Sequence, residues 1–134
     1  MGLIRGINHV TLATADLERA VRFYVEGLGL ALRRQWETGA YLEAGTFWLC
    51  LSYDPKTRTE APPEYTHLAF DVSRSDFAAA VARLEAAGAR SWRENRSEGE
   101  SFYFLDPDCH KLELHVGNLS SRLAAMDARE IKGQ

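Results

Sequence analysis

Two stretches of the chain repeat apolar residues at the three- and four-residue spacing of an amphipathic helix. The first runs from Asp16 to Tyr24 and the second from Ser75 to Leu84. In each stretch the apolar positions fall at i, i+3, i+4 and i+7, which lines one face of a helix. Asp16 and Ser75 or Asp76 can cap these helices, and glycines follow both stretches. The pattern therefore predicts two helices, each with one apolar side to bury.

Short strand-like runs surround each helix. A run at 8–13 precedes the first helix and a run at 66–71 precedes the second, and each carries a histidine at its second position. Three more strand candidates follow each helix, separated by turn residues. They span 30–36, 41–43 and 47–52 in the first half, and 90–93, 101–105 and 111–115 in the second. Each half therefore reads as a βαβββ module.

The repeat sets the expected organisation of the chain. The first module spans about 5–52 and the second about 65–117, joined by a polar linker at 53–64 that contains three prolines. A short final helix is expected at 119–126, followed by a polar tail that frays. We predict an α+β fold as one domain over 1–134, with the paired modules forming a curved mixed sheet around a cleft and the helices outside. The sheet edges need partners, from the same chain or from a second one.

Composition narrows the function classes. Among 134 residues, 46% are hydrophobic and 26% charged, and the net charge is −3. Without a broad basic field, neither nucleic acid nor an anionic membrane surface is an expected partner. No apolar run approaches the roughly 20 residues of a membrane span, and the first residues lack the apolar core of a signal peptide. We therefore expect a cytoplasmic protein, with Cys50 and Cys109 as free thiols.

Histidines at equivalent positions of the repeat indicate a metal site. His9 and His67 occupy the same place in the two modules, so a pseudo-twofold relation would make them face each other across the cleft. Glu113 alternates with apolar neighbours in the last strand candidate and points away from them. Two imidazoles and one carboxylate suit Zn²⁺, Mn²⁺ or Fe²⁺ and leave positions open for a substrate. His115 is the rival ligand, and His110 is expected at the surface. The simpler alternative is that each histidine is a satisfied polar residue on a sheet face.

A polar loop at 92–101 is the second candidate feature. Its arginines, hydroxyls and glycine could bind an anion, or its oxygens could bind a monovalent cation. A solvated hairpin loop is the alternative. Arg122 could add an anion contact or be a surface charge. Four strand aromatics could line a site, although such residues more often belong to a core: Trp36, Tyr41, Trp48 and Tyr103.

Several motifs together resemble one known family. They are Asn-His-x-Thr-Leu-Ala at 8–13, Gly-Ala-Tyr-Leu-Glu at 39–43, Trp-Leu-Cys-Leu-Ser at 48–52, Tyr-Thr-His at 65–67, Asn-Arg-Ser-Glu-Gly-x-Ser-Phe-Tyr-Phe-Leu-Asp-Pro-Asp at 95–108 and Leu-Glu-Leu-His-Val-Gly at 112–117. The chain resembles the vicinal oxygen chelate superfamily, which includes glyoxalase I, extradiol dioxygenases and bleomycin-binding proteins. Within it, the closest resemblance is to the fosfomycin-resistance glutathione transferases.

The resemblance implies a set of site residues. It places Mn²⁺ on His9, His67 and Glu113, with a homodimer in which His9 comes from one subunit and the other two ligands from its partner. The phosphonate of fosfomycin would be held by Thr11, Arg93, Ser97, Tyr103 and Arg122. A K⁺ loop would involve Asn95, Ser97, Gly99 and Ser101. Glutathione would lie beside Trp36, Tyr41, Trp48 and Cys50, with Tyr41 orienting or deprotonating the thiol.

The implied reaction is addition of the glutathione thiol to the epoxide, with the metal stabilising the alkoxide that forms. Two residues depart from the family pattern. Arg93 replaces a lysine, and Cys109 replaces a glycine, which would strain a turn that needs a positive φ and leave a reactive thiol near the surface.

Alternative functions remain at this level. Related epoxide hydrolases carry a glutamate base near the position of Gly39, and Glu43 keeps that possibility open. Other relatives use bacillithiol or cysteine. A metal-free drug-binding module is a further alternative. A glyoxalase or isomerase would normally need a fourth ligand in the strand at 47–52, which offers none.

Overall fold

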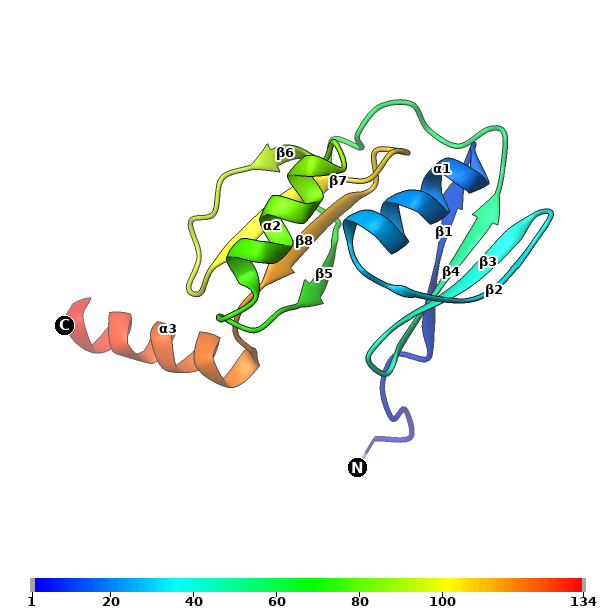
Figure 1. Ribbon diagram of the computed structural model, residues 1–134. Coiled ribbons are helices and arrows are strands. Elements are labelled where there is room, and N and C mark those ends of the chain that lie inside the picture. Colours follow the sequence, from blue (N-terminus) through cyan, green and yellow to red (C-terminus); the bar gives the residue numbers. More distant parts are fainter. Residues whose placement is uncertain (1, 134) are drawn as a thin grey trace.

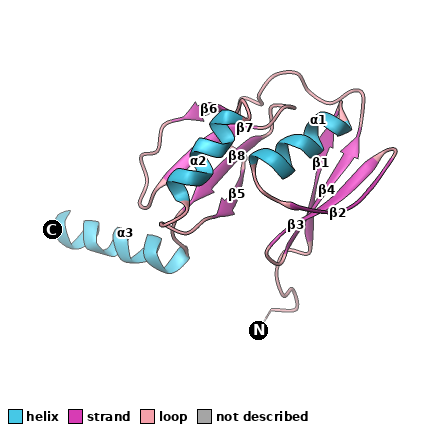
Figure 2. Ribbon diagram, viewed as in Figure 1, coloured by secondary structure: helices cyan, strands magenta, loops and turns pink. Residues whose placement is uncertain are grey.

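The first half of the chain folds into one four-stranded sheet with a helix on one face (Figures 1 and 2). The computed structural model describes residues 2–133, with side chains through residue 130. The elements are β1 (His9–Thr14), α1 (Leu17–Arg22), the π-helical turn η1 (Phe23–Gly27), β2 (Ala31–Trp36), β3 (Gly39–Ala44) and β4 (Phe47–Tyr53). The strand order is β1-β4-β3-β2, with β1 parallel to β4 and the other pairs antiparallel.

The second half repeats this arrangement. Its elements are β5 (Leu68–Asp71), α2 (Phe77–Ala86), β6 (Arg90–Arg93), β7 (Ser101–Leu105) and β8 (Lys111–His115). The order β5-β8-β7-β6 is the same, with the first pair again parallel. The α+β class and the paired βαβββ modules are therefore confirmed.

Three local features differ from the sequence-based expectation. The first helix widens into the π-helical turn η1, where Leu28 donates to the carbonyl of Phe23, five residues back. Gly39 is the first residue of β3 and not part of a turn. The last helix, α3 (Leu119–Gly133), continues beyond the expected end at 126, so the predicted end of this helix was too early.

The start of α1 and the buried faces of α1 and α2 agree with the sequence pattern of caps and apolar stripes. Asp16 caps α1 by accepting a hydrogen bond from the backbone of Arg19 at 3.1 Å. The apolar stripe of α1, with Leu17, Ala20 and Val21, is buried. On α2 only Leu84 is fully buried, and the rest of its stripe is half-buried. The amphipathic reading was therefore sufficient to find both helices.

One hydrophobic core joins the two modules. It contains Tyr24, Leu42 and Leu49 from the first half together with Leu84 and Phe104 from the second. The helices α1 and α2 lie against their sheets on the sides that meet in this core (Figure 1). A single chain thus holds two separate sheets and not one continuous curved sheet, because the core forms between the helix-covered faces. Within residues 2–133, the opposite face of each sheet carries no helix.

The termini lie away from this core. Helix α3 extends beyond β8 as an arm, and the N-terminal segment leads out from β1 (Figure 1). Leu3, Ile4 and Ile7 on that segment are exposed, as are Leu119 and Leu123 on α3. Across the described residues, every helix is too short or too polar to traverse a bilayer.

Candidate metal and substrate site

Strand register places the predicted site residues on the two helix-free sheet faces. In the first sheet, Thr11 pairs with Cys50, which pairs in turn with Tyr41, while His9 pairs with Trp48. Side chains alternate between faces along a strand, so these five residues share one face. Their neighbours in sequence, such as Val10, Leu12 and Leu49, pack into the core.

The second sheet repeats this partition. Glu113 pairs with Tyr103, which lies beside Arg93, and Ser101 pairs with His115. Leu112 and Leu114, between the polar positions, are buried in the core on the other side. Each module therefore presents one polar and aromatic face that its own helix does not cover.

His67 and Glu113 form the centre of the second face. His67 precedes β5, and its Nε2 lies 2.9 Å from Oε1 of Glu113. The Nδ1 of His67 donates to the carbonyl of Tyr65 at 2.7 Å, which leaves Nε2 directed at the carboxylate. The Glu113 side chain is only 7% exposed, so its charge requires a partner at this position.

A serine and a second histidine hold the other carboxylate oxygen. The Ser101 hydroxyl donates to Oε2 of Glu113 at 2.6 Å. The same Oγ lies 2.6 Å from Nδ1 of His115. His115, the rival ligand in the sequence, is thus bonded to Ser101.

His9 lies on the first sheet, apart from this pair. Its Nδ1 donates to Oδ1 of Asn8 at 2.7 Å, and its ring packs on Trp48 with centroids 4.4 Å apart. Among residues 2–130 of one chain, no three His, Cys, Asp or Glu side chains are grouped so as to hold a metal. The expectation that His9 and His67 face each other within one chain is therefore not met. The physical reason is the core, which joins the helix-covered faces and leaves the ligand-bearing faces apart.

The chemistry of these donors nevertheless fits a divalent metal. Each imidazole has its Nδ1 bonded to a neighbouring oxygen, Asn8 for His9 and the Tyr65 carbonyl for His67. This leaves Nε2 as the ligand atom in both, which is the usual arrangement around metal-binding histidines. With Glu113 the set is two nitrogens and one carboxylate, which Mn²⁺, Fe²⁺ and Zn²⁺ accept.

An aromatic wall with a cation surrounds His67. The guanidinium of Arg93 lies 4.4 Å from the centre of the Tyr65 ring and 5.9 Å from that of Tyr103. Hydrogen bonding to Tyr103, with burial, raises the pKa of the Tyr65 hydroxyl above its ordinary value. Trp92 closes the group against Tyr103 at 5.1 Å. Sequence reasoning gave Tyr65 no role, although its place two residues before His67 was a usable signal.

The polar loop between β6 and β7 is organised from within. Asn95 donates to the carbonyl of Gly99 at 2.8 Å and accepts from the backbone and hydroxyl of Ser97 at 3.1 and 2.9 Å. Arg122 of α3 donates to the side chain and carbonyl of Glu98 at 3.2 and 3.3 Å. The loop is therefore not a simple solvated hairpin, and Arg122 is not a free surface charge.

Three aromatic rings form a row on the first sheet. Tyr41 contacts Trp36 at 4.7 Å and Trp48 at 5.3 Å, both edge to face. The indole N–H of Trp48 is buried and lacks a hydrogen-bond partner in the protein. Such an orphan donor is costly unless a ligand accepts from it. Cys50 is buried beneath this face and is not an exposed thiol.

The positions raised by the hydrolase alternative offer no free base. A Cβ on Gly39 would lie 2.6 Å from Cζ2 of Trp36 and 3.0 Å from the carbonyl of Leu51, so a side chain does not fit without movement. Glu43 is paired with Arg33, with Oε1 and Nε 3.1 Å apart.

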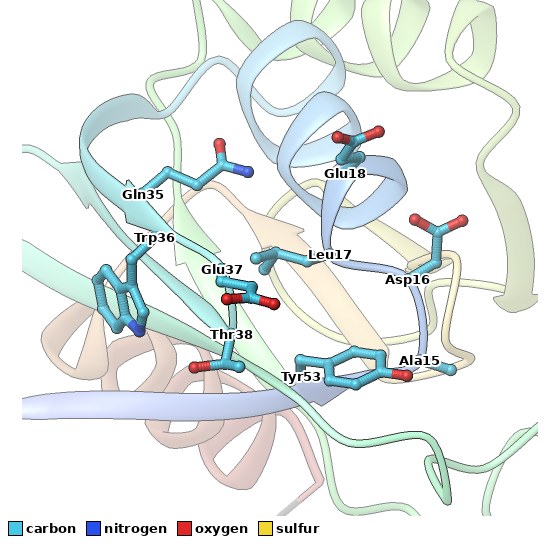
Figure 3. A pocket seen from close by; sticks show the side chains of 9 residues that line it. All are labelled: Ala15, Asp16, Leu17, Glu18, Gln35, Trp36, Glu37, Thr38 and Tyr53. Carbon is cyan, nitrogen blue, oxygen red and sulfur yellow. The ribbon is translucent and has the colours of Figure 1, made fainter.

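A cavity of about 530 Å³ lies elsewhere, at the far end of the first module (Figure 3). Trp36 lines it, and its charged lining residues are all acidic: Asp16, Glu18 and Glu37. Three carboxylates would repel the carboxylates of glutathione. The cavity shares Trp36 with the aromatic row but contains none of His9, His67 and Glu113.

Two turn residues differ from expectation. Cys109 has φ of 65°, so the predicted left-handed turn is present, but its thiol is buried and faces the Thr59 carbonyl at 3.5 Å. The expectation of a reactive surface thiol was wrong.

His110 is also partly buried. Its Nε2 donates to the carbonyl of Ala13 at 2.7 Å, and Arg58 donates to its Nδ1 at 2.6 Å. This turn links the second module to the end of β1.

Comparison with known proteins agrees with this geometry. Residues 6–114 match the model of the Glyoxalase/Bleomycin resistance protein/Dioxygenase superfamily. The glutathione transferase FosA of Serratia marcescens is 52% identical over 134 residues, covering 98% of this chain and 94% of that protein. The metallothiol transferase FosB of Shouchella clausii is 39% identical, covering 91% of this chain and 87% of that protein.

Solved structures give the same result. The fosfomycin resistance protein FosX of Mesorhizobium loti superposes with a TM-score of 0.77 at 29% identity, covering 90% of this chain and 99% of that one. FosX of Listeria monocytogenes, crystallised with Mn(II) and sulfate, gives 0.78 at 26% identity, with coverage of 92% and 99%. On its sequence, its repeated fold and these likenesses, the chain belongs to the Glyoxalase/Bleomycin resistance protein/Dioxygenase superfamily.

Proposed function

We propose that this protein is a metal-dependent thiol transferase that inactivates fosfomycin by adding glutathione across its epoxide. The observation that carries the proposal is the sorting of donors by sheet face. One face presents His9, Thr11 and the row of aromatics, and the other presents His67, Glu113 and Arg93. The likeness to FosA of Serratia marcescens, named a glutathione transferase, supports the choice of thiol.

The site needs both faces, and a homodimer supplies them. Within one chain the core holds the helix-covered faces together, which separates His9 from the pair of His67 and Glu113. In our proposal the first module of one subunit covers the second module of its partner. Each dimer would then contain two sites, each with His9 from one subunit and the other two ligands from the partner. Exposed rings at Trp36, Tyr41 and Tyr65 on these faces favour such a contact.

Mn²⁺ is the proposed metal, because a relative was crystallised with Mn(II) and the nitrogen and carboxylate donors here suit it. When bound, it would supply Lewis acidity to the epoxide oxygen as the ring opens. Asn8 and the Tyr65 carbonyl orient the two imidazoles, and Ser101 orients the carboxylate.

The phosphonate would lie against the cationic side of the second face. Arg93 is held over the Tyr65 ring, which fixes its planar fork for an anion. Arg122 brings a second guanidinium to the loop through its pair with Glu98. Thr11, Ser97 and Tyr103 would add hydroxyl donors. K⁺ bound by the loop of Asn95, Ser97, Gly99 and Ser101 remains part of the proposal.

The thiol would approach from the first face. Trp36, Tyr41 and Trp48 form a wall there, with Cys50 beneath it. The unpaired indole N–H of Trp48 would donate to a ligand oxygen, and Tyr41 would orient the sulfhydryl or take its proton. Because glutathione must be kept reduced, we place the reaction in the cytoplasm.

Bacillithiol or cysteine as the thiol is the second candidate, favoured by the 39% identity to the metallothiol transferase FosB of Shouchella clausii. Hydrolysis is disfavoured by the lack of space at Gly39 and by the ion pair of Glu43 with Arg33. Metal-free drug binding is disfavoured because both imidazoles have Nε2 prepared as a ligand atom.

The proposal is tested by comparing thiols on metal-stripped and Mn²⁺-reloaded enzyme. We expect fosfomycin turnover only after reloading, with glutathione a better donor than cysteine or bacillithiol, and loss of turnover in Glu113→Ala. The exposed Glu130→Ala is the matched control and should behave as the parent protein. Full turnover by stripped protein, or by Glu113→Ala, would overturn the proposal.

A further inference from the structure

We propose that His115 is a positioning residue that fixes Glu113 through Ser101, and that it is not itself a metal ligand. The inference rests on the proposed function only in taking Glu113 as a ligand. His115 and Glu113 are two residues apart on β8 and point to the same face, and Ser101 is the cross-strand partner of His115 on β7. The three side chains therefore meet on one sheet face.

The direction of the hydrogen bonds follows from counting protons. The Glu113 carboxylate only accepts, so the Ser101 hydroxyl proton is directed at its Oε2, 2.6 Å away. The hydroxyl has no second proton, so its oxygen accepts from Nδ1 of His115, also at 2.6 Å. The relay runs from His115 through Ser101 to Glu113, and Nδ1 of His115 also lies 3.4 Å from Oε2 of Glu113 itself. Its direction requires the proton of the His115 ring to be on Nδ1.

The His115 ring lies in a space that two glycines keep open. A Cβ on Gly99 would come within 3.0 Å of Cε1 of His115, and a Cβ on Gly117 within 3.2 Å of Nε2. Both glycines have positive φ, 80° and 132°. The imidazole side chain is only 16% exposed. The ring is therefore held between the loop that ends at Ser101 and the start of the segment leading to α3.

This arrangement has a consequence for the proposed ligand. With Oε2 held by Ser101, Oε1 of Glu113 is the oxygen that faces Nε2 of His67. Outer hydrogen bonds of this kind fix the orientation of a ligand and typically contribute about 10- to 100-fold to metal affinity. The same relay connects the loop at 94–100 with the carboxylate, so a change in that loop would reach the metal site through Ser101.

His115 is not the ligand in this proposal, because its Nδ1 is engaged by Ser101 and its Nε2 lies against Gly117, whereas Nε2 of His67 lies at Glu113. Replacement should therefore weaken metal binding moderately and leave it measurable. Loss of a true ligand, as in Glu113→Ala, should be much more severe.

The test measures Mn²⁺ dissociation constants of the full-length protein by electron paramagnetic resonance, without fosfomycin or thiol. His115→Asn retains a side-chain N–H near the position of Nδ1, whereas His115→Leu has none. We expect His115→Leu and Ser101→Ala each to weaken Mn²⁺ binding about 10- to 100-fold, and His115→Asn to restore most of the loss. The double variant should be no weaker than either single one, because both break the same relay.

Matched controls separate this effect from unfolding. The exposed Ser52→Ala removes a strand hydroxyl outside the relay and should leave Mn²⁺ affinity unchanged. The melting temperature of each metal-free variant gives the cost to folding alone. If His115→Leu does not fold, Ser101→Ala and His115→Asn still decide the question.

The outcomes are distinct. Three results would overturn the relay. The first is parental Mn²⁺ affinity in His115→Leu or Ser101→Ala. The others are equal losses of affinity in the two His115 variants, and additive losses in the double variant. Abolished binding in both His115 variants, as severe as in Glu113→Ala, would overturn it in favour of a ligand role. A parent that binds Mn²⁺ but leaves fosfomycin unchanged would remove the proposed function and leave the relay standing.

Discussion

Nε2 of His67 lies 2.9 Å from Oε1 of Glu113, although 46 residues separate them in the chain. The equivalent histidine of the other module, His9, has no such carboxylate and packs on Trp48. The repeat is therefore symmetric in fold and asymmetric in chemistry. One module supplies two of the proposed ligands and the other supplies the third, which makes the origin of the ligands directly testable.

Mixing of inactive subunits should restore activity. In a heterodimer of His9→Ala and Glu113→Ala chains, a shared site predicts one site with both lesions and one intact site. We expect each homodimer to be inactive and the copurified heterodimer, isolated with two different affinity tags, to show turnover close to half that of the parent. The physical reason is that intact His67 and Glu113 of the first chain meet intact His9 of the second.

The control for this experiment pairs His67→Ala with Glu113→Ala. His67 and Glu113 are both ligands from the second module, and here one chain lacks the first and the other chain lacks the second. Each site keeps one lesion, so this heterodimer should remain inactive. No recovery in the first pair would show that His9 does not come from a different subunit than His67 and Glu113. Recovery in this second pair would show that His67 and Glu113 themselves come from different subunits, which would contradict the proposed pairing of the modules.

Gly39→Ala should impair the thiol side alone. The added Cβ would lie 2.6 Å from Cζ2 of Trp36, so the indole must move away from Tyr41. We expect the KM for glutathione to rise several-fold while the dissociation constant for Mn²⁺ stays at its parental value. Gly45→Ala is the control for backbone strain alone, because its Cβ meets nothing within 4 Å although its φ is 58°. It should leave the KM for glutathione at its parental value. An unchanged KM for glutathione in Gly39→Ala would show that Trp36 does not contribute to the thiol site.

The sequence was sufficient to predict each βαβββ module, because the signals that define a module are local. Alternation along the strands and the stripes on α1 and α2 gave both modules, and the position of Glu113 between two core leucines gave its face. The relation between the modules could not be derived in this way. It depends on which faces the shared core joins. Periodicity predicts that residues such as Leu84 and Phe104 are buried, but it does not reveal that they share a core with the first module.

The site shows the same limit. His9 and His67 were found from their equivalent positions in the repeat, but the groups that orient their rings by hydrogen bonds were not. Bonds from His67 to the Tyr65 carbonyl and from Arg122 to Glu98 depend on side-chain orientation, which residue spacing does not determine. His110 was misplaced at the surface because a turn sequence does not reveal that another segment, here the end of β1, packs over it.

Cys109→Gly should stabilise the protein. Cys109 has φ of 65°, a conformation that costs a residue with a Cβ about 1 kcal/mol, and glycine adopts it without that cost. Loss of a small buried side chain offsets part of the gain. We therefore expect an increase of a few tenths to about 1 kcal/mol in the free energy of unfolding, measured by urea titration at fixed protein concentration. Cys109→Ala keeps the strain, and equal stability of the Gly and Ala variants would contradict this account.

Asp106→Asn should change how stability depends on pH. Burial raises the pKa of Asp106 above its ordinary 3.8, although His110 and the hydroxyl of Tyr24 partly oppose this. A raised carboxyl pKa means that the folded state retains the proton longer than the unfolded state. Stability therefore falls as pH rises above 3.8, until the folded carboxyl ionises as well. The asparagine has no such titration.

The measurement is urea unfolding of both proteins at several values between about pH 4 and pH 7. The free energy of unfolding of the parent minus that of Asp106→Asn should decrease as pH rises through the lower part of this range, and then level off. The subtraction removes contributions from other titrating groups common to both. A difference that rises with pH would indicate a lowered pKa and contradict the assignment.

The most direct test of the proposed activity is ³¹P NMR of fosfomycin incubated with the protein, Mn²⁺ and K⁺, with and without glutathione. We predict a new phosphonate signal only in the presence of glutathione, and no new signal with Glu113→Ala under the same conditions. A new signal without any thiol would indicate hydrolysis. An unchanged spectrum in both tubes, with Mn²⁺ bound to the protein, would contradict the assignment of fosfomycin as the substrate.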